Sequence, residues 1–167
     1  GEVIAAVRHW LARAVIGLNL CPFAKSVYVK DQVRYVVSQA SDDADVFDDL
    51  ERELRLLAAA DPAQVDTTLL IVPHGLADFL AYNDFLYFAD RLLGSLKLEG
   101  TLQIASFHPQ YQFDGTGPDD IENYTNRAPY PILHLLREDS IAQIAGKIRL
   151  LAAGKPIAGV VDLGRGY

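Results

Sequence analysis

TTLLIVP occupies residues 67–73 and is apolar almost throughout after its two threonines. Continuous apolar runs of this kind are typical of strands that are buried on both faces, as in parallel sheets covered by helices on each side. We therefore expect residues 67–73 to form such a strand in an α/β domain.

Helices and strands are predicted to alternate on both sides of this segment. The expected elements are an amphipathic helix over 4–18, a strand over 34–40, a helix over 41–60, the strand over 67–73, a helix over 78–93, a strand over 102–107 and a helix that begins near 139. Such alternation favours right-handed crossovers and a largely parallel sheet.

ILHLL, residues 132–136, leaves the topology of the sheet open. We expect it to be a short edge strand, and antiparallel pairing there would give a mixed sheet or a two-layer α+β sandwich. The prediction is an α/β fold with a largely parallel or mixed sheet of three to five strands and about four flanking helices; the alternative is the two-layer sandwich. The 167 residues fit a single domain.

Composition and charge disfavour several classes of partner and location. The chain has 15 basic and 22 acidic side chains, a net charge of −7, so it is expected to repel nucleic acid and anionic membranes. Arg8, His9 and Arg13 interrupt the first apolar segment too often for a membrane span. A single cysteine allows no intrachain disulfide, which favours a reducing, cytoplasmic compartment. The sequence does not predict the oligomeric state.

Two histidines follow predicted strands directly. His74 comes after residues 67–73 and His108 after residues 102–107. Ligands of open parallel sheets bind beyond the carboxyl ends of the strands, so neighbouring parallel strands would place both imidazoles at one edge. Each is a candidate acid, base or ligand, and the alternative is a histidine that a loop carbonyl satisfies.

The segment from His108 to Tyr130 is rich in Pro, Gly, Asp and Asn and has no helical or strand periodicity. A loop of this length in a compact domain is usually functional or mobile. Arg127 has five fixed donors that suit a carboxylate or phosphate, and Asn123 and Asn126 can donate and accept beside it. The alternative is a loop whose polar groups satisfy one another. Asn123 also begins a glycosylation sequon, which we regard as incidental in a reducing compartment.

Cys21 lies in NLCPFAK, where Lys25 is close enough in sequence to lower the pKa of a thiol. A nucleophilic Cys21 needs a base, for which His108 and His134 are the candidates. The alternative is a small buried filler. No pair of possible ligands has a spacing that predicts a metal site, and no cofactor is assigned.

Four separated segments resemble a bacterial family known only as domain of unknown function 1415. They are GLNLCPFAK, YNDFL, QIASFHPQYQF and NYTNRAPYPILHLLRE, and the resemblance extends from about Gly17 to Glu138. It implies a small bacterial protein without an assigned reaction or cofactor. Ala128 stands where the resemblance leads us to expect a serine. The resemblance makes ten residues within these segments stronger candidates for a functional role: Asn19, Cys21, Asn83, His108, Tyr111, Asn123, Asn126, Arg127, His134 and Arg137.

These observations lead to three hypotheses. The first is an enzyme that acts on an anionic small molecule, with His108, Cys21 and His134 as catalytic candidates and Arg127 as the clamp for the anionic group. The remaining residues raised by the resemblance would bind the substrate. The second is a non-catalytic module that binds a small anion or a protein through the same loop. In the third, the loop only holds the sheet together, and Arg127→Ala unfolds the protein.

Overall fold

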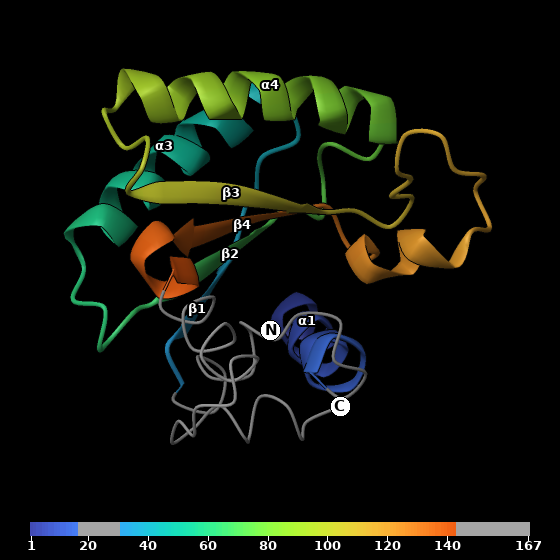
Figure 1. Cartoon of the computed structure of the whole chain (residues 1–167), viewed down its shortest axis with the longest axis horizontal. Helices are drawn as coiled ribbons and strands as arrows, with labels where there is room; N and C mark the ends of the chain where they lie inside the picture. The colour runs from blue at the N-terminus through green and yellow to red at the C-terminus, as the bar shows by residue number, and fades with distance from the viewer. Residues whose placement is uncertain (17–30, 143–167) are drawn as a thin grey trace, which may run out of the picture.

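The sheet has four strands within residues 1–16 and 31–142, which the computed structural model describes. They are β1 (Val33–Val37), β2 (Thr67–Ile71), β3 (Leu102–Phe107) and β4 (Ile132–Arg137). Their order is β1-β2-β4-β3, with β1 parallel to β2 and β4 antiparallel to both β2 and β3. Three strands therefore run in one direction and β4 runs against them (Figure 1). The prediction of a mixed sheet is confirmed.

The prediction that ILHLL is an edge strand is wrong. β4 lies between β2 and β3, and its first four residues are buried. The apolar composition accounts for the burial of both faces of β4. Its place in the sheet depends instead on pairing with β2 and β3, from which it is distant in the sequence. Antiparallel pairing, which the sequence left open, is observed.

Helices cover both faces of the sheet (Figure 1). On one face lie α3 (Asp43–Ala59) and α4 (Phe79–Ser95). On the other lies α1 (Glu2–Trp10), which continues as a π-helical segment, η1 (Leu11–Ile16). This arrangement agrees with the α/β prediction rather than with the two-layer alternative.

Aspartates begin both long helices. The Asp42 carboxylate accepts a hydrogen bond from the Asp45 amide, and the Asp78 carboxylate accepts one from the Ala81 amide. The predicted first residues, Ser41 and Asp78, are each within two residues of the observed start. A further helix begins at residue 138, and its predicted continuation beyond 142 lies outside the described residues.

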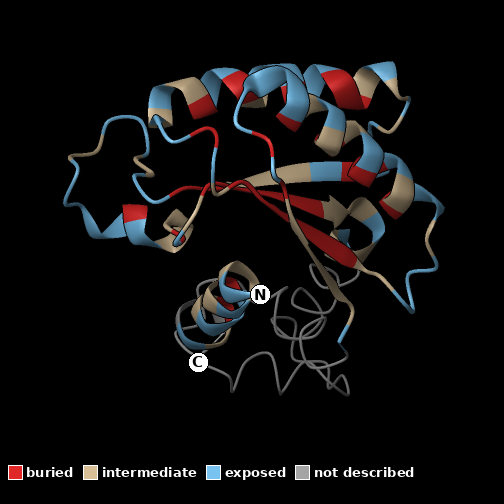
Figure 2. Ribbon diagram, turned by 180° about the vertical axis from the view of Figure 1, so that it is seen from behind, coloured by how far each residue is buried: buried red, intermediate tan, exposed pale blue. Residues whose placement is uncertain are grey.

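The apolar core is divided by the sheet into two clusters (Figure 2). The larger one lies beneath α3 and α4, and the smaller one lies beneath α1. Tyr82 of α4 connects the sheet to the helical layer, because its buried hydroxyl donates to the Ile132 carbonyl at 2.6 Å and accepts from the Phe107 amide at 3.1 Å. None of the described helices is both long and apolar enough to span a bilayer.

Candidate functional site

The carboxyl ends of β2 and β3 lie at the same end of the sheet, because β4 is antiparallel to both strands. We call this end, beyond the last residues of β2 and β3, the loop edge of the sheet. β4 separates them, so they are not the parallel neighbours that the sequence predicted. Residues 108–131 connect β3 to β4 and extend beyond this edge, with a 3₁₀ helix, η2 (Ile121–Asn126), inside them (Figure 1). The two histidines of this edge differ in burial: His74 is exposed, and His108 is 1% exposed.

Both ring nitrogens of His108 have backbone partners. Nδ1 accepts from the Gln110 amide at 3.0 Å, so Nε2 carries the proton and donates to the Leu76 carbonyl at 2.9 Å. The ring packs against Phe79 and Tyr82, with centroid distances of 5.3 and 4.9 Å. Burial lowers the pKa of the imidazole, and the carbonyls of residues 76 and 77 offset part of that effect. The two hydrogen bonds thus fix the first residues of the loop through a neutral imidazole.

Asn123 is fully buried at the centre of the loop. Its Oδ1 accepts from the Phe113 amide at 2.8 Å, and its Nδ2 donates to the Gly117 carbonyl at 2.8 Å. The side chain thus replaces the backbone partners that an irregular segment lacks. Because this amide nitrogen is buried and bonded, the sequon at Asn123 is inaccessible in the folded chain.

Asn126 ties the end of η2 to β3. Its Nδ2 donates to the Ser106 carbonyl at 2.9 Å, and its Oδ1 accepts from the Thr125 hydroxyl at 2.7 Å. Its backbone carbonyl accepts from the His108 amide at 3.0 Å. The two ends of the loop are therefore joined at the sheet edge.

Arg127 holds two parts of the loop through its guanidinium. Nε donates to the Tyr111 carbonyl at 3.0 Å, and one terminal nitrogen donates to the Pro118 carbonyl at 2.5 Å. The guanidinium lies 4.7 Å from the centre of the Tyr124 ring, a cation–π distance. The Arg127 carbonyl in turn accepts from the Trp10 indole of α1 at 3.0 Å.

Tyr111 is the fifth sequence-predicted residue in this loop. Its hydroxyl accepts from the Ser106 hydroxyl at 3.2 Å, and its ring contacts Phe79 and Phe113. The structure thus brings together five predicted site residues: His108, Tyr111, Asn123, Asn126 and Arg127. Each of them is engaged with other parts of the chain.

His134 lies apart from these five, in β4 on the face that α1 covers. The Thr67 hydroxyl donates to the Leu135 carbonyl at 2.6 Å, so Nε2 of His134 must donate to Thr67 Oγ1 at 2.8 Å. Burial lowers the pKa of His134 to about 4. The ring is therefore neutral at neutral pH.

Arg137 and Asn83 also lie elsewhere. One Arg137 nitrogen donates to the carbonyls of Leu57, Ala60 and Val65, around the end of α3 and beside the opposite edge of the sheet. Asn83 is exposed on α4. The two remaining predicted residues, Asn19 and Cys21, lie outside the described residues.

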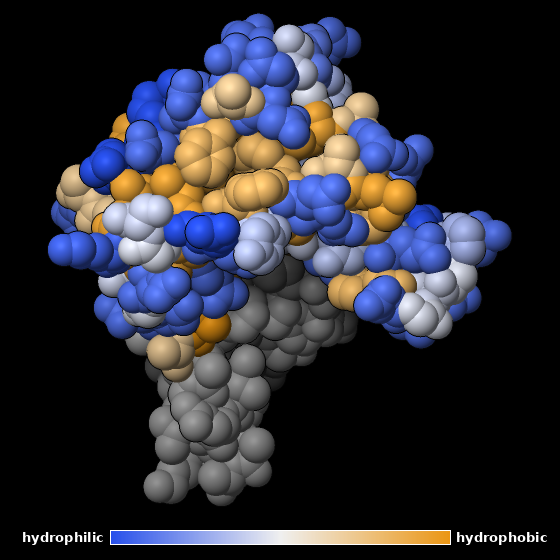
Figure 3. All heavy atoms as spheres, turned by 90° about the horizontal axis from the view of Figure 1, so that it is seen from above, coloured by the Kyte–Doolittle hydropathy of each residue, from blue (hydrophilic) through white to orange (hydrophobic). Residues whose placement is uncertain are grey.

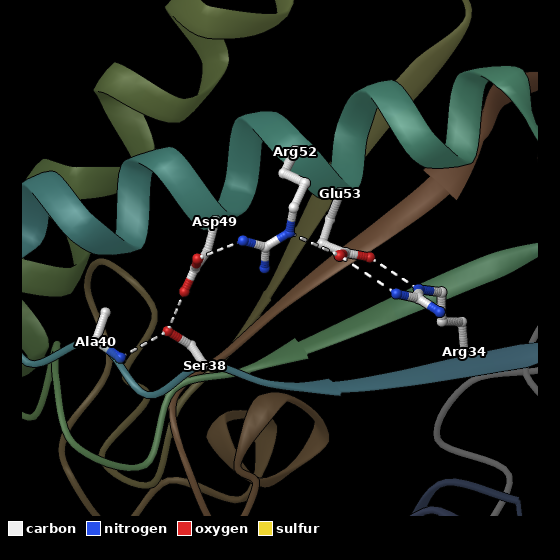
Figure 4. Close-up of polar contacts among 6 residues, drawn as sticks. All are labelled: Arg34, Ser38, Ala40, Asp49, Arg52 and Glu53. Carbon is white, nitrogen blue, oxygen red and sulfur yellow. Dashed lines mark hydrogen bonds and ion pairs between the residues drawn. The ribbon is translucent and has the colours of Figure 1, made fainter.

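Sequence reasoning missed a polar network between β1 and α3 (Figure 4). The Ser38 hydroxyl donates to Asp49 at 2.6 Å, and Asp49 pairs with Arg52 at 2.9 Å. Glu53, which is 1% exposed, accepts from Arg34 at 2.9 Å and pairs with Arg52 at 3.4 Å. One signal was present: Glu53 stands three residues after Leu50 and four before Leu57, on the apolar stripe of its helix.

An open polar hollow of about 500 Å³ adjoins this network, lined by Val37, Gln39, Ala40, Asp45, Asp48, Asp49 and Arg52. Repulsion from Asp42, together with smaller effects of burial and other carboxylates, raises the pKa of Asp45. Among residues 1–16 and 31–142, no group of three His, Cys, Asp or Glu side chains is placed to hold a metal ion.

Three large apolar or aromatic side chains of the loop are exposed to solvent, whereas the amide of Asn123 is buried. Ile121 is 81% exposed, Tyr124 is 51% exposed and Phe113 is 38% exposed. Large apolar side chains on a rigid polar scaffold are a feature of recognition surfaces.

The comparisons with known proteins give one finding. A family model described as "Protein of unknown function (DUF1415)" matches residues 2–151. No match was found among curated proteins or among solved structures.

Proposed function

The chain belongs to the DUF1415 family, whose model includes the entire loop, and from this premise we propose that the domain is a non-catalytic protein-binding module. The recognition surface is the loop surface, defined here as the exposed side chains of residues 113–124. Its partner is a protein with basic and apolar side chains.

One observation supports this proposal above the others. Three polar side chains of the loop could in principle bind a ligand or transfer a proton. All three form hydrogen bonds with backbone groups of the chain instead: His108, Asn123 and Arg127. The residues with exposed area, Ile121 and Tyr124, are apolar or aromatic. An acid or base needs a reachable nitrogen or oxygen, whereas a recognition surface needs rigid apolar contacts.

The negative charge of the loop surface favours a partner with basic side chains. Asp114, Asp119, Asp120 and Glu122 are all exposed. The nearest cation of the loop, Arg127, faces carbonyls and an aromatic ring. Lysines and arginines of a partner would therefore meet uncompensated carboxylates around an apolar centre.

The hydrogen bonds inside the loop also favour binding through preorganisation. A flexible loop of this length would lose conformational entropy when it binds, and that loss weakens affinity. Here Asn123 and Arg127 hold three points of the loop before any partner arrives. The surface is thus ordered in the free protein.

Less supports the alternative, an enzyme that uses the histidines of this domain. Neither His108 nor His134 presents an imidazole that is both free and basic. Cys21 and Asn19 lie outside the described residues, so a role for them stays a prediction.

Site-specific crosslinking tests the proposal. A photoreactive amino acid is placed at Ile121, and a control at Glu99, which is exposed and precedes β3 at the opposite edge. In cells of the source organism, position 121 should give a discrete adduct that position 99 does not. Excess wild-type protein should suppress the adduct, and Ile121→Asp protein should not. Equal labelling at both positions, or adducts that wild-type protein does not suppress, would exclude the loop surface as a binding site.

A further inference from the structure

A second apolar surface lies on the helical face, away from the loop. A hollow of about 290 Å³ separates α3 from α4 and is lined by Asp43, Ala44, Phe47, Asp84, Phe85 and Phe88. Figure 3 looks onto these two helices and shows apolar side chains gathered in the middle of the face, with hydrophilic ones around them. We call this hollow the α3–α4 groove.

The floor of the α3–α4 groove is aromatic. Phe47 and Phe85 meet edge to face with centroids 6.3 Å apart, and Phe85 is buried. Phe88 is 54% exposed at the border of the groove. Leu80, eight residues earlier on α4, is also exposed, with the exposed Asp84 midway between it and Phe88.

The rim of the groove is acidic. Asp43 on α3 and Asp84 on α4 are exposed, and neither has an ion-pair partner among the described residues. Arg91 lies near the far end of α4, over the ring of Tyr87 at 5.9 Å. The two carboxylates that line the groove are thus without a counter-charge among the described residues.

We propose that the α3–α4 groove binds an amphipathic helix of another protein, one that has large apolar side chains on one face and lysines or arginines beside them. A groove between two helices accepts a third helix through residues at i, i+3, i+4 and i+7 spacing. The acidic rim selects basic flanking residues. A second copy of this chain fits poorly, because its net charge is −7 and its own rim is acidic. This inference does not depend on the loop surface.

The test uses a fluorescent peptide of about 18 residues, with leucines at helical spacing and lysines between them. A matched peptide has glutamates in place of the lysines. Fluorescence anisotropy with the full-length chain should show binding of the leucine–lysine peptide in the micromolar range, and none of the leucine–glutamate peptide. No binding of the first peptide up to about 1 mM, or equal binding of both, would overturn the proposal.

Three variants locate the binding. Phe88→Ala should raise the Kd about tenfold, because it removes the exposed aromatic side chain of the groove from the contact. Asp84→Lys should raise the Kd and reduce its dependence on salt. Glu99→Lys, which makes the same charge change at an exposed position outside both the groove and the loop surface, should change the Kd less than about twofold. If Glu99→Lys weakens binding as much as Asp84→Lys, or Phe88→Ala has no effect, the groove is not the site. Circular dichroism confirms that each variant is folded.

Discussion

Nε of Arg127 donates a hydrogen bond to the backbone carbonyl of Tyr111 at 3.0 Å, across 16 residues of chain. The sequence suggested the opposite use of this guanidinium, as a clamp for an anionic ligand. Both uses need the same fixed donors, and here backbone carbonyls occupy them. This contact is one reason why we propose a recognition role for the loop.

Removal of the Arg127 guanidinium should therefore loosen the loop. Arg127→Ala is expected to lower the free energy of unfolding by about 1–3 kcal/mol, because two carbonyls lose a charged donor. Arg127→Lys should recover only part of the loss, since an ammonium cannot reproduce the planar fork. Urea denaturation measures both changes. An unchanged midpoint for Arg127→Ala would contradict this assignment.

Asn123→Asp tests the centre of the loop with almost no change in volume. The substitution replaces the Nδ2 donor with an oxygen that faces the Gly117 carbonyl in a fully buried position. The protein should lose about 3 kcal/mol or more at neutral pH, since a charge is buried without a partner. The loss should shrink at acidic pH, where a protonated carboxyl regains a donor. Equal stability of variant and wild type at pH 7 would argue against the observed contacts.

His134 should make stability depend on pH. Its pKa is about 4 in the folded chain and 6.5 when exposed, so the unfolded state binds more protons between these values. Stability from this residue is complete above pH 6.5 and is lost as the pH falls toward 4, by about 3 kcal/mol. His134→Gln removes the titration. Its free energy of unfolding should fall less than that of the wild type between pH 7 and pH 4.5, whereas parallel curves would refute the assignment.

Exposed residues of the loop surface should be dispensable for folding. Ile121→Asp and Tyr124→Ser are expected to change the free energy of unfolding by less than about 1 kcal/mol, with the larger effect at Tyr124 because Arg127 lies over its ring. In the crosslinking experiment, an excess of either variant protein should suppress the adduct at position 121 less than an excess of wild-type protein does. Thermal unfolding of the two variants beside Arg127→Ala is the check. A strong loss of stability in Ile121→Asp would mean that the side chain is structural.

Most elements of the fold follow from local patterns. The apolar run at residues 67–73 and the alternation of helices and strands predicted α3, β2, α4 and β3 to within a few residues. The central place of β4 did not follow, because strand order depends on pairing between segments far apart in sequence. Local composition shows that a strand is buried and does not show between which neighbours.

The site was harder to predict than the fold. Composition identified the loop, since Gly, Pro, Asn and Asp suit irregular backbone. It did not show which way the polar groups point, because Asn123 and Arg127 have the same hydrogen-bonding capacity toward a ligand as toward a carbonyl. Arg137 is ten residues from Arg127 in the sequence, yet the six residues of β4 carry it about 17 Å toward the opposite end of the strands.

The central claim is that the polar side chains of His108, Asn123 and Arg127 stabilise the loop, and that its exposed apolar side chains bind a protein partner. The ¹⁵N chemical shifts of the His108 ring, followed by NMR as the pH is lowered, test this most directly. We expect a neutral ring protonated at Nε2, with a pKa below 6.5 because the ring is buried. A pKa at or above 6.5, or a proton at Nδ1, would mean that the imidazole is available for acid–base chemistry and would contradict the account.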